Sequence, residues 1–263
     1  MTGRDTDEKI GRIAEMIREA RRIVVFTGAG VSTESGIPDF RSPGGLWSRF
    51  DPDDFTIERF LASPETRRKQ WRFLVSGGLF KDARPNAAHA AIAELDTLGR
   101  LECVITQNID NLHQMAGNDP RRVFELHGNT RWIRCVECGD RTSMGEILGK
   151  YGAADAPPAC ERCGGIMKPD VIFFGEALPE DALREATWHA NHCDLLIVVG
   201  SSLVVYPAAS LPFAAEQAGA KLIIVNLTPT PADGIADVVI NASAGEALTR
   251  IIAEVKRRPL GCA

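Results

Sequence analysis

Apolar residues recur along the chain with two different spacings, which separate expected helices from expected strands. Ile10, Ile13, Ala14 and Ile17 recur at helical spacing and predict a helix over residues 6–20. The run RRIVVFTGAG that follows is apolar and β-branched and stops at a pair of glycines. It predicts a buried parallel strand that ends in a tight turn.

The same order of helix and strand is repeated through most of the chain. Further helices are expected over residues 86–98, 179–191, 207–217 and 244–256. Further strands are expected at LECVIT, VFEL, CDLLIVVG, KLIIVN and ADVVI. This alternation predicts an α/β fold with a doubly wound, Rossmann-like parallel sheet that helices cover on both faces. Folds of this kind bind their ligands beyond the carboxyl ends of the strands.

Two stretches interrupt the alternation. Residues 31–85 contain a loop rich in glycine and proline, and residues 131–168 contain two cysteine pairs with little apolar periodicity. Each stretch is expected to be an insertion, and the two together are expected to form a smaller lobe. The sheet domain would then comprise residues 1–30, 86–130 and 169–263.

Small polar residues stand at the carboxyl ends of four of the expected strands. They are Gly28-Ala29-Gly30, Thr106-Gln107-Asn108, Gly200-Ser201-Ser202 and Asn226. Because the carboxyl ends of parallel strands meet at one edge of a sheet, we expect these residues to converge on a single site.

The first of these strand ends begins like a dinucleotide-binding fingerprint, in which glycines let backbone amides approach a pyrophosphate. Thr33 stands where the third glycine would be, so a plain turn from strand to helix is an alternative. In the next loop, prolines and glycines bracket Asp39, Phe40 and Arg41, a composition typical of functional loops. The alternative is a solvated connector in which Phe40 packs into the core.

The two Cys-x-x-Cys pairs, Cys135 with Cys138 and Cys160 with Cys163, have the spacing of a zinc ribbon. Redox use of the pairs is the alternative. Four thiolates would complete a tetrahedral shell and leave no position for a catalytic water, so the zinc would be structural. His127 is then not required as a metal ligand.

The five histidines differ in their surroundings. His89 and His113 lie in expected helices and favour structural roles, and His189 and His192 lie near a helix end where positive charge suits the helix dipole. His127 follows an expected strand and precedes a glycine, so its imidazole is a candidate general base.

Composition is typical of a soluble globular protein. Hydrophobic residues make up 44% and charged residues 25% of the chain, and the formal net charge of -5 gives no reason to expect nucleic-acid binding. The charged N-terminal stretch lacks the apolar run of a signal peptide, and no apolar segment has the length of a membrane span. We therefore expect a cytoplasmic protein.

Several motifs together resemble the sirtuins, which are NAD-dependent protein lysine deacylases. The matching stretches are GAGVSTESGIPDFRSPGGLW, TQNIDNLHQMAG, ELHGN, both cysteine pairs, PDVIFFGE, GSSLVVYPA and IIVN. They follow the family's order from Gly28 to Asn226, and the short ends are similar to those of compact prokaryotic members.

The resemblance implies roles for individual residues. Those implied to contact NAD are Gly28, Ala29, Gly30, Ser32, Thr33, Asp39, Phe40, Arg41, Gln107, Asn108, Ile109, Asp110, Gly200, Ser201, Ser202 and Asn226. Those implied to flank an acylated-lysine peptide are Val171, Ile172, Phe173, Val204, Val205 and Tyr206. His127 and Asn108 would be catalytic, and Cys135, Cys138, Cys160 and Cys163 would hold structural zinc.

The resemblance also implies the reaction. The acyl-lysine oxygen would displace nicotinamide from its ribose, and His127 would then take a proton from a ribose hydroxyl, so that the products are O-acyl-ADP-ribose and free lysine. An unperturbed imidazole pKa of ~6.5 suits that role. Relatives that prefer succinyl-lysine carry a Tyr-x-x-Arg pair, whereas this region reads Trp71-Arg72-Phe73-Leu74, so acetyl-lysine is expected to be preferred.

Three other functions remain alternatives. Mono-ADP-ribosyl transfer would use the same NAD site with a different acceptor, and a sensor of NAD or ADP-ribose would bind without catalysis. A nucleic-acid-binding zinc ribbon is disfavoured, because residues 131–168 carry both charge signs and few aromatic residues that look exposed.

Overall fold

A central sheet of six parallel strands organises the larger part of the protein. The computed structural model describes residues 3–78, 80–152 and 155–257, so the remaining residues of the expected domain ranges lie outside this description. The strands stand in the order β3-β2-β1-β7-β8-β9. They are β1 (Ile23–Thr27), β2 (Leu101–Thr106), β3 (Val123–Glu125), β7 (Leu195–Val199), β8 (Lys221–Val225) and β9 (Val238–Ile240). The order reverses between β1 and β7, which confirms the doubly wound prediction.

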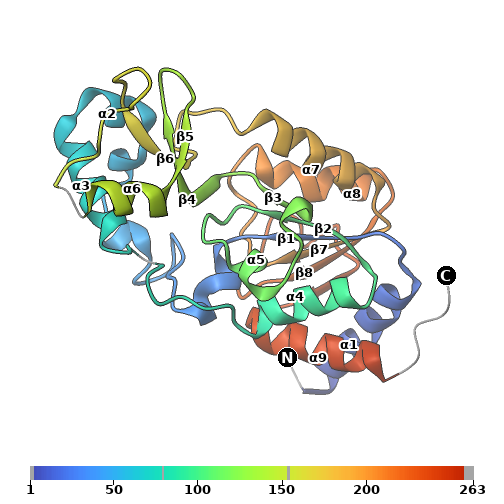
Figure 1. Ribbon diagram of the computed structural model, residues 1–263. Helices are drawn as coiled ribbons and strands as arrows, with labels where there is room; N and C mark the ends of the chain where they lie inside the picture. The colour runs from blue at the N-terminus through green and yellow to red at the C-terminus, as the bar shows by residue number, and fades with distance from the viewer. Residues whose placement is uncertain (1–2, 79, 153–154, 258–263) are drawn as a thin grey trace.

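Helices cover both faces of this sheet (Figure 1). On one face lie α1 (Gly3–Glu19), α4 (Ala87–Thr97) and α9 (Ala244–Lys256), and on the other lie α7 (Glu180–His192) and α8 (Leu211–Gln217). Successive side chains of β1 alternate between the two cores, with Val25 packed on the first face and Phe26 on the second. Burial on both faces explains why the strands are continuous apolar runs.

The expected helices are confirmed with one difference in detail. Asn86 caps α4 as expected, and its Oδ1 accepts the backbone N–H of Ala88 at 2.8 Å. Within residues 207–217, a 3₁₀ turn (Ala208–Ser210) precedes α8. Pro212 has no N–H to donate to the carbonyl of Ala208, so the α-helical hydrogen bonds cannot extend back through that turn.

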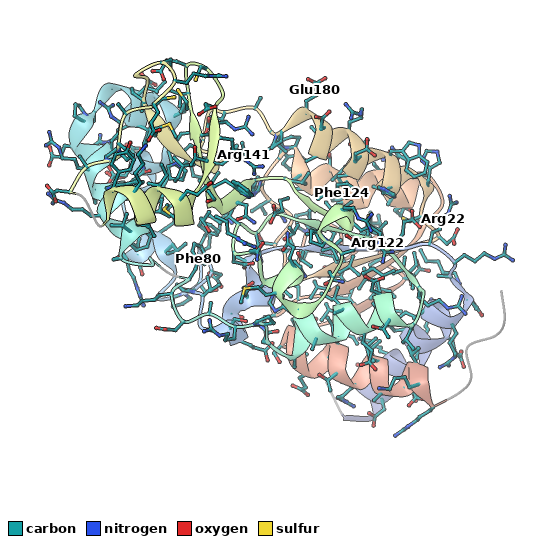
Figure 2. All side chains as sticks on the ribbon, viewed as in Figure 1. Arg22, Phe80, Arg122, Phe124, Arg141 and Glu180 are labelled. Carbon is teal, nitrogen blue, oxygen red and sulfur yellow. The ribbon has the colours of Figure 1, made fainter. Side chains whose placement is uncertain are left out.

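A second, antiparallel sheet forms the smaller lobe at one end of the molecule (Figure 1). Its strands, in the order β5-β4-β6, are β4 (Gly128–Cys135), β5 (Arg141–Ser143) and β6 (Met167–Val171). Beside them lie α2 (Ile57–Ala62), α3 (Pro64–Val75) and α6 (Met144–Tyr151). Figure 2 places Arg141 on this lobe and Glu180 at the end of α7 nearer to it.

The two interrupting stretches share one hydrophobic core. Trp71 of α3 is buried with Ile133 of β4, Ile147 of α6 and Met167 of β6. Trp132 and Tyr151, however, are each 36% exposed, so this lobe presents more aromatic surface than the sequence suggested. The antiparallel geometry turns alternate β4 side chains outward, which leaves Trp132 on the solvent side.

Several shorter elements complete the described structure. They are α5 (Leu112–Ala116) and the 3₁₀ segments Ala29–Ser35, Leu46–Ser48, Pro52–Phe55 and Pro120–Arg122. Among the described residues, no helix has the length and apolarity needed to cross a membrane.

Candidate active site

The polar ends of β1, β2 and β7 meet, as the sequence predicted. The backbone N–H of Gly30 donates to the carbonyl oxygen of Gly200 at 2.8 Å. The side-chain amide of Gln107 donates to Ser201 Oγ at 2.8 Å. These contacts join the strand ends on either side of the point where the sheet order reverses, which is where doubly wound folds place ligands.

Glycine is required at three of these positions by close backbone approach. Gly200 has φ +60°, and a methyl group added there would lie 2.2 Å from the backbone nitrogen of Val31. One added at Gly30 would lie 2.8 Å from the Cα of Gly200, and one at Gly28 would lie 2.9 Å from its oxygen. From the sequence, Gly28 and Gly30 were expected to let a phosphate approach the backbone. The structure shows a second reason for glycine: the turn after β1 packs directly on the turn after β7.

A small depression opens beside these turns at the carboxyl ends of β7 and β8. Its lining consists mostly of small residues, namely Gly30, Thr33, Gly200, Val225, Asn226, Leu227, Ala242, Ser243 and Ala244. The Asn226 side chain is held beside it by donating to the backbone oxygen of Thr228 at 2.8 Å. Small side chains leave room for an extended ligand to lie against backbone amides.

A buried polar network lies at the ends of β1 and β2. Asn108 Nδ2 donates to Ser32 Oγ at 3.0 Å, and the Ser32 hydroxyl donates to Asp110 Oδ2 at 2.7 Å. Burial raises the pKa of Asp110, while hydrogen bonds from Leu112 and Ser32 oppose that rise. Three of the residues expected to contact NAD are therefore connected to one another by side-chain hydrogen bonds.

Two buried histidines lie next to this network, and His89 Nε2 is 3.5 Å from Ser32 Oγ. His113 Nε2 lies 2.9 Å from Thr27 Oγ1, and His89 forms the capping box of α4 with Asn86. Burial lowers the pKa of His89 to about 4 and that of His113 to about 3. Their expected structural roles are confirmed. Their contact with each other, with ring centroids 5.0 Å apart, was not foreseen from the sequence.

His127 is fixed at its Nδ1 atom. This nitrogen lies 2.9 Å from the backbone oxygen of Gln107. A carbonyl oxygen can only accept, so Nδ1 carries the proton and Nε2 keeps a free lone pair. Burial lowers the pKa of His127, and the hydrogen bond to Gln107 opposes this effect. The imidazole is consequently neutral near pH 7 and able to accept a proton.

The loop that follows the first turn is shaped by Asp39. Its Oδ1 accepts the backbone N–H groups of Arg41 and Ser42 at 2.9 and 2.7 Å, and its Oδ2 accepts the Ser42 hydroxyl at 2.6 Å. Burial alone would raise the pKa of Asp39, but these hydrogen bonds outweigh it and lower the pKa. The carboxylate therefore organises the loop.

Phe40 is 39% exposed, so the alternative in which it packs into the core is wrong. Its ring contacts Trp47 at a centroid distance of 5.2 Å, and Trp47 contacts Phe174 at 6.0 Å. Trp47 and Phe174 were not singled out from the sequence, although both lie inside the quoted motifs GGLW and FFGE. Their contact joins the Asp39 loop to the segment after β6.

The residues expected to flank a peptide divide into two groups. Val171 and Phe173 are buried against Phe60, so their side chains face the interior of the small lobe. Val204 and Tyr206, by contrast, are 47% and 65% exposed. A peptide beside the first group would meet its backbone and the side chains that alternate with it.

The region expected to contact the acyl group is also defined. Trp71 is buried in the core of the small lobe, and Arg72 points to the surface, where its guanidinium forms two hydrogen bonds with Asp155 at 2.6 and 2.7 Å. Phe73 packs on Phe50 with ring centroids 5.1 Å apart.

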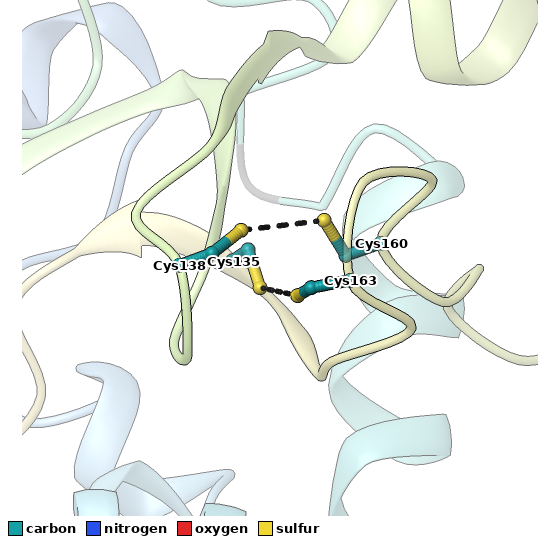
Figure 3. A group of neighbouring side chains, drawn as sticks. All are labelled: Cys135, Cys138, Cys160 and Cys163. Carbon is teal, nitrogen blue, oxygen red and sulfur yellow. Dashed lines mark hydrogen bonds between the residues drawn. The ribbon is translucent and has the colours of Figure 1, made fainter.

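The four cysteines form a separate site (Figure 3). Their sulfurs all lie within 4.8 Å of one another, with 3.5 Å between Cys135 and Cys163 and 3.6 Å between Cys138 and Cys160. Zinc–sulfur bonds of about 2.3 Å in a tetrahedron place sulfurs roughly 3.8 Å apart, so the arrangement fits zinc. It is the group with metal-ligand character found among the described residues, and it does not include His127.

The cysteine pairs sit on two similar turns. Gly139 and Gly164, which directly follow Cys138 and Cys163, have φ of +71° and +76°. Their N–H groups donate to the carbonyl oxygens of Cys135 and Cys160 at 3.0 and 2.7 Å. The strand β4 runs from beside His127 to Cys135, a span of roughly 24 Å at ~3.4 Å per residue. The histidine and the cysteine site are therefore distant in space.

Comparison with known proteins gives a consistent result. Residues 28–207 match the family described as Sir2. The NAD-dependent protein deacylase 2 of Archaeoglobus fulgidus is 48% identical over 95% of this chain and 98% of its own length. The NAD-dependent protein deacetylase of Rhodopseudomonas palustris is 47% identical over 91% and 94%. A solved structure of Sir2 with a p53 peptide and NAD+ has a TM-score of 0.83 and 42% identity, and the match covers 94% of this chain and 98% of that one.

Proposed function

This chain belongs to the Sir2 family, and on that premise we propose that its crevice carries out NAD-dependent deacylation of acyl-lysine in proteins. The named relatives are NAD-dependent deacylases and deacetylases, and a related structure holds a peptide together with NAD+. The observation that carries the proposal is His127, whose protonated Nδ1 leaves Nε2 free as a base beside the joined strand ends.

NAD would lie along the carboxyl ends of the strands. The turn from Gly28 to Thr33 and the residues Gly200, Ser201, Ser202 and Asn226 would hold its pyrophosphate and adenosine, because small side chains line the depression there. Gln107, Asn108, Ile109 and Asp110 would hold the nicotinamide end. Asp39 keeps the loop of Phe40 and Arg41 in shape, and the partly exposed Phe40 ring, which lies against Trp47, would cover the reacting ribose.

NAD supplies an activated ribose carbon once nicotinamide leaves. His127 would take a proton from a ribose hydroxyl at Nε2, and the Gln107 carbonyl would stabilise the imidazolium through Nδ1–H. Asn108 would orient the ribose through its buried amide, which Ser32 already holds. Zinc would be bound by Cys135, Cys138, Cys160 and Cys163 and would order the small lobe, since four thiolates complete its shell.

The substrate would be a protein segment that carries an acylated lysine. It would lie between the two parts of the molecule beside Val171, Phe173, Val204 and Val205, with most contacts made by backbone. Acetyl and other uncharged acyl groups would be preferred. The division into a sheet domain and an inserted lobe, with the ranges given above, and a cytoplasmic location are part of this proposal.

One experiment tests the central claim. Nicotinamide release from NAD is measured with and without an acetylated peptide, for wild type and for His127→Ala. We expect peptide-dependent release in wild type, together with free lysine and O-acetyl-ADP-ribose. Release that needs no peptide, or full deacetylation by the variant, would overturn the proposal. A labelled protein acceptor would indicate ADP-ribosyl transfer, and binding without turnover would indicate a sensor.

A further inference from the structure

Lys168 is a buried lysine outside the residues discussed so far. It lies on β6 opposite Arg134 of β4, and its side chain is 6% exposed. Burial lowers the pKa of Lys168, while Glu176 opposes this effect. Burying a charged ammonium group costs free energy unless its N–H donors have acceptors. The acceptors of Lys168 therefore indicate what this side chain does.

All three donors of the Lys168 ammonium group have acceptors. Nζ lies 3.1 Å from the backbone oxygen of Pro169, 2.5 Å from that of Val171 and 3.0 Å from Glu176 Oε2. It also lies 4.4 Å from the centre of the Phe173 ring. One side chain thus binds two backbone carbonyl oxygens of β6 and the carboxylate of Glu176.

Glu176 closes the other end of the same segment. Its Oε2 accepts the backbone N–H of Phe173 at 2.7 Å, and its own N–H donates to the oxygen of Phe173 at 3.0 Å. The Lys168–Glu176 ion pair therefore spans residues 168–176 from start to finish, and we call these residues the clamped segment.

The clamped segment is attached to the catalytic histidine and to the small lobe. The N–H of Ile172 donates to the backbone oxygen of His127 at 2.9 Å. The N–H of Phe174 donates to Phe55 at 2.9 Å, and its oxygen accepts from Ile57 at 3.0 Å. The fit is tight, since a methyl group at Gly128 would lie 2.0 Å from the Asp170 oxygen.

We propose that Lys168 and Glu176 are positioning residues for the acyl-lysine peptide, which hold the backbone of residues 171–174 in the one shape that the peptide contacts beside His127. The inference rests on the proposed function, because it concerns the segment assigned there to the peptide. It names two residues that reach no substrate atom and act through the backbone they bind.

An ion pair of this kind contributes little net stability compared with apolar side chains of the same volume. Its specific effect is to fix several backbone groups in one arrangement. Loss of the pair should therefore weaken peptide binding more than it weakens NAD binding, which depends on the strand ends of the large sheet.

The test compares Lys168→Met with Lys150→Met in the full chain. Lys150 lies in the same lobe, is 58% exposed and pairs with Glu161, so it serves as the matched control. We expect the KM for an acetylated peptide to rise about tenfold or more in Lys168→Met, with the KM for NAD within about twofold. Lys150→Met should leave both values unchanged. Zinc content and Tm are measured for each variant.

Glu176→Gln keeps an acceptor for the Phe173 N–H but removes the charge that pairs with Lys168. If Lys168→Met does not fold, the peptide KM of Glu176→Gln tests the inference by itself. An unchanged peptide KM, or equal rises in the KM values for peptide and NAD, would overturn the inference. Inactive wild type would instead overturn the proposed function, so the two failures are distinguishable.

Discussion

The Nδ1–H of His127 donates a hydrogen bond to the backbone oxygen of Gln107, 2.9 Å away, and this contact decides which ring nitrogen can accept a proton. Gln107 closely follows β2 and His127 closely follows β3, so the large sheet positions both the imidazole and the backbone carbonyl that it contacts. The predictions below begin with this pair.

Replacing His127 with alanine should lower deacylation by a factor of about 10² to 10⁴, the usual contribution of a general base. Because the pKa of His127 is lowered by burial, wild type should keep a flat rate near pH 7 and lose activity below pH ~6.5 as the ring gains a proton. The measurement is the pH profile of kcat/KM. An acid limb centred above pH ~6.5 would contradict this assignment.

Removing zinc should unfold the small lobe, because structural zinc binding is worth on the order of 10 kcal/mol. Cys135→Ser should abolish zinc binding and activity together. Cys193→Ser is the control, since Cys193 lies outside the four-cysteine group and its thiol donates to the backbone oxygen of Ala190 at 3.3 Å. Metal analysis and circular dichroism provide the readouts. Full activity in metal-free Cys135→Ser would show that the lobe does not depend on zinc.

Gly200→Ala should destabilise the protein by about 3 kcal/mol or more, because it combines a left-handed backbone with a steric clash. The added methyl would lie 2.2 Å from the Val31 nitrogen. Gly149→Ala, in α6 with open space around the added methyl, should instead stabilise by about 0.5 to 1 kcal/mol. Denaturant unfolding measures both. Similar values for the two variants would mean that the contact between the turns relaxes freely.

Acetyl-lysine peptides should be turned over at least about tenfold more efficiently than succinyl-lysine peptides, because an ionised carboxylate is costly to bury without a partner. Arg72, the basic residue of the expected acyl region, is engaged with Asp155 at the surface. The measurement is kcat/KM for two peptides that differ in the acyl group alone. Comparable values would defeat the prediction.

His113 should make the protein less stable in acid. Its pKa is about 3 in the folded protein and ~6.5 when unfolded, so the unfolded state binds the extra proton between these values. Its stabilising contribution is therefore complete above pH ~6.5 and is lost as the pH falls, at up to ~1.4 kcal/mol per pH unit. His113→Gln should flatten the dependence of unfolding free energy on pH between 4 and 6.5. An unchanged slope would assign the acid sensitivity to other groups.

The sequence by itself determined the features that depend on residues close together in the chain. Helical and strand periodicity, the Asn86 cap and the cysteine spacing each act over a few residues, so they predicted the doubly wound sheet, the start of α4 and the four-thiolate site. It also predicted that polar strand ends converge, because parallel strands end at one edge.

Only the tertiary structure decided the contacts between segments that are distant in the chain. In the fold, Gly200 lies against Val31 and the Phe173 side chain is buried in the small lobe. The paired Lys168 and Glu176 side chains also bind three backbone groups of residues 169–173. Periodicity predicts which face of an element is buried, but not which atoms of another segment meet it there. Those contacts are set by packing of the whole chain, so the tautomer of His127 and the shape of the clamped segment could be read only from the folded protein.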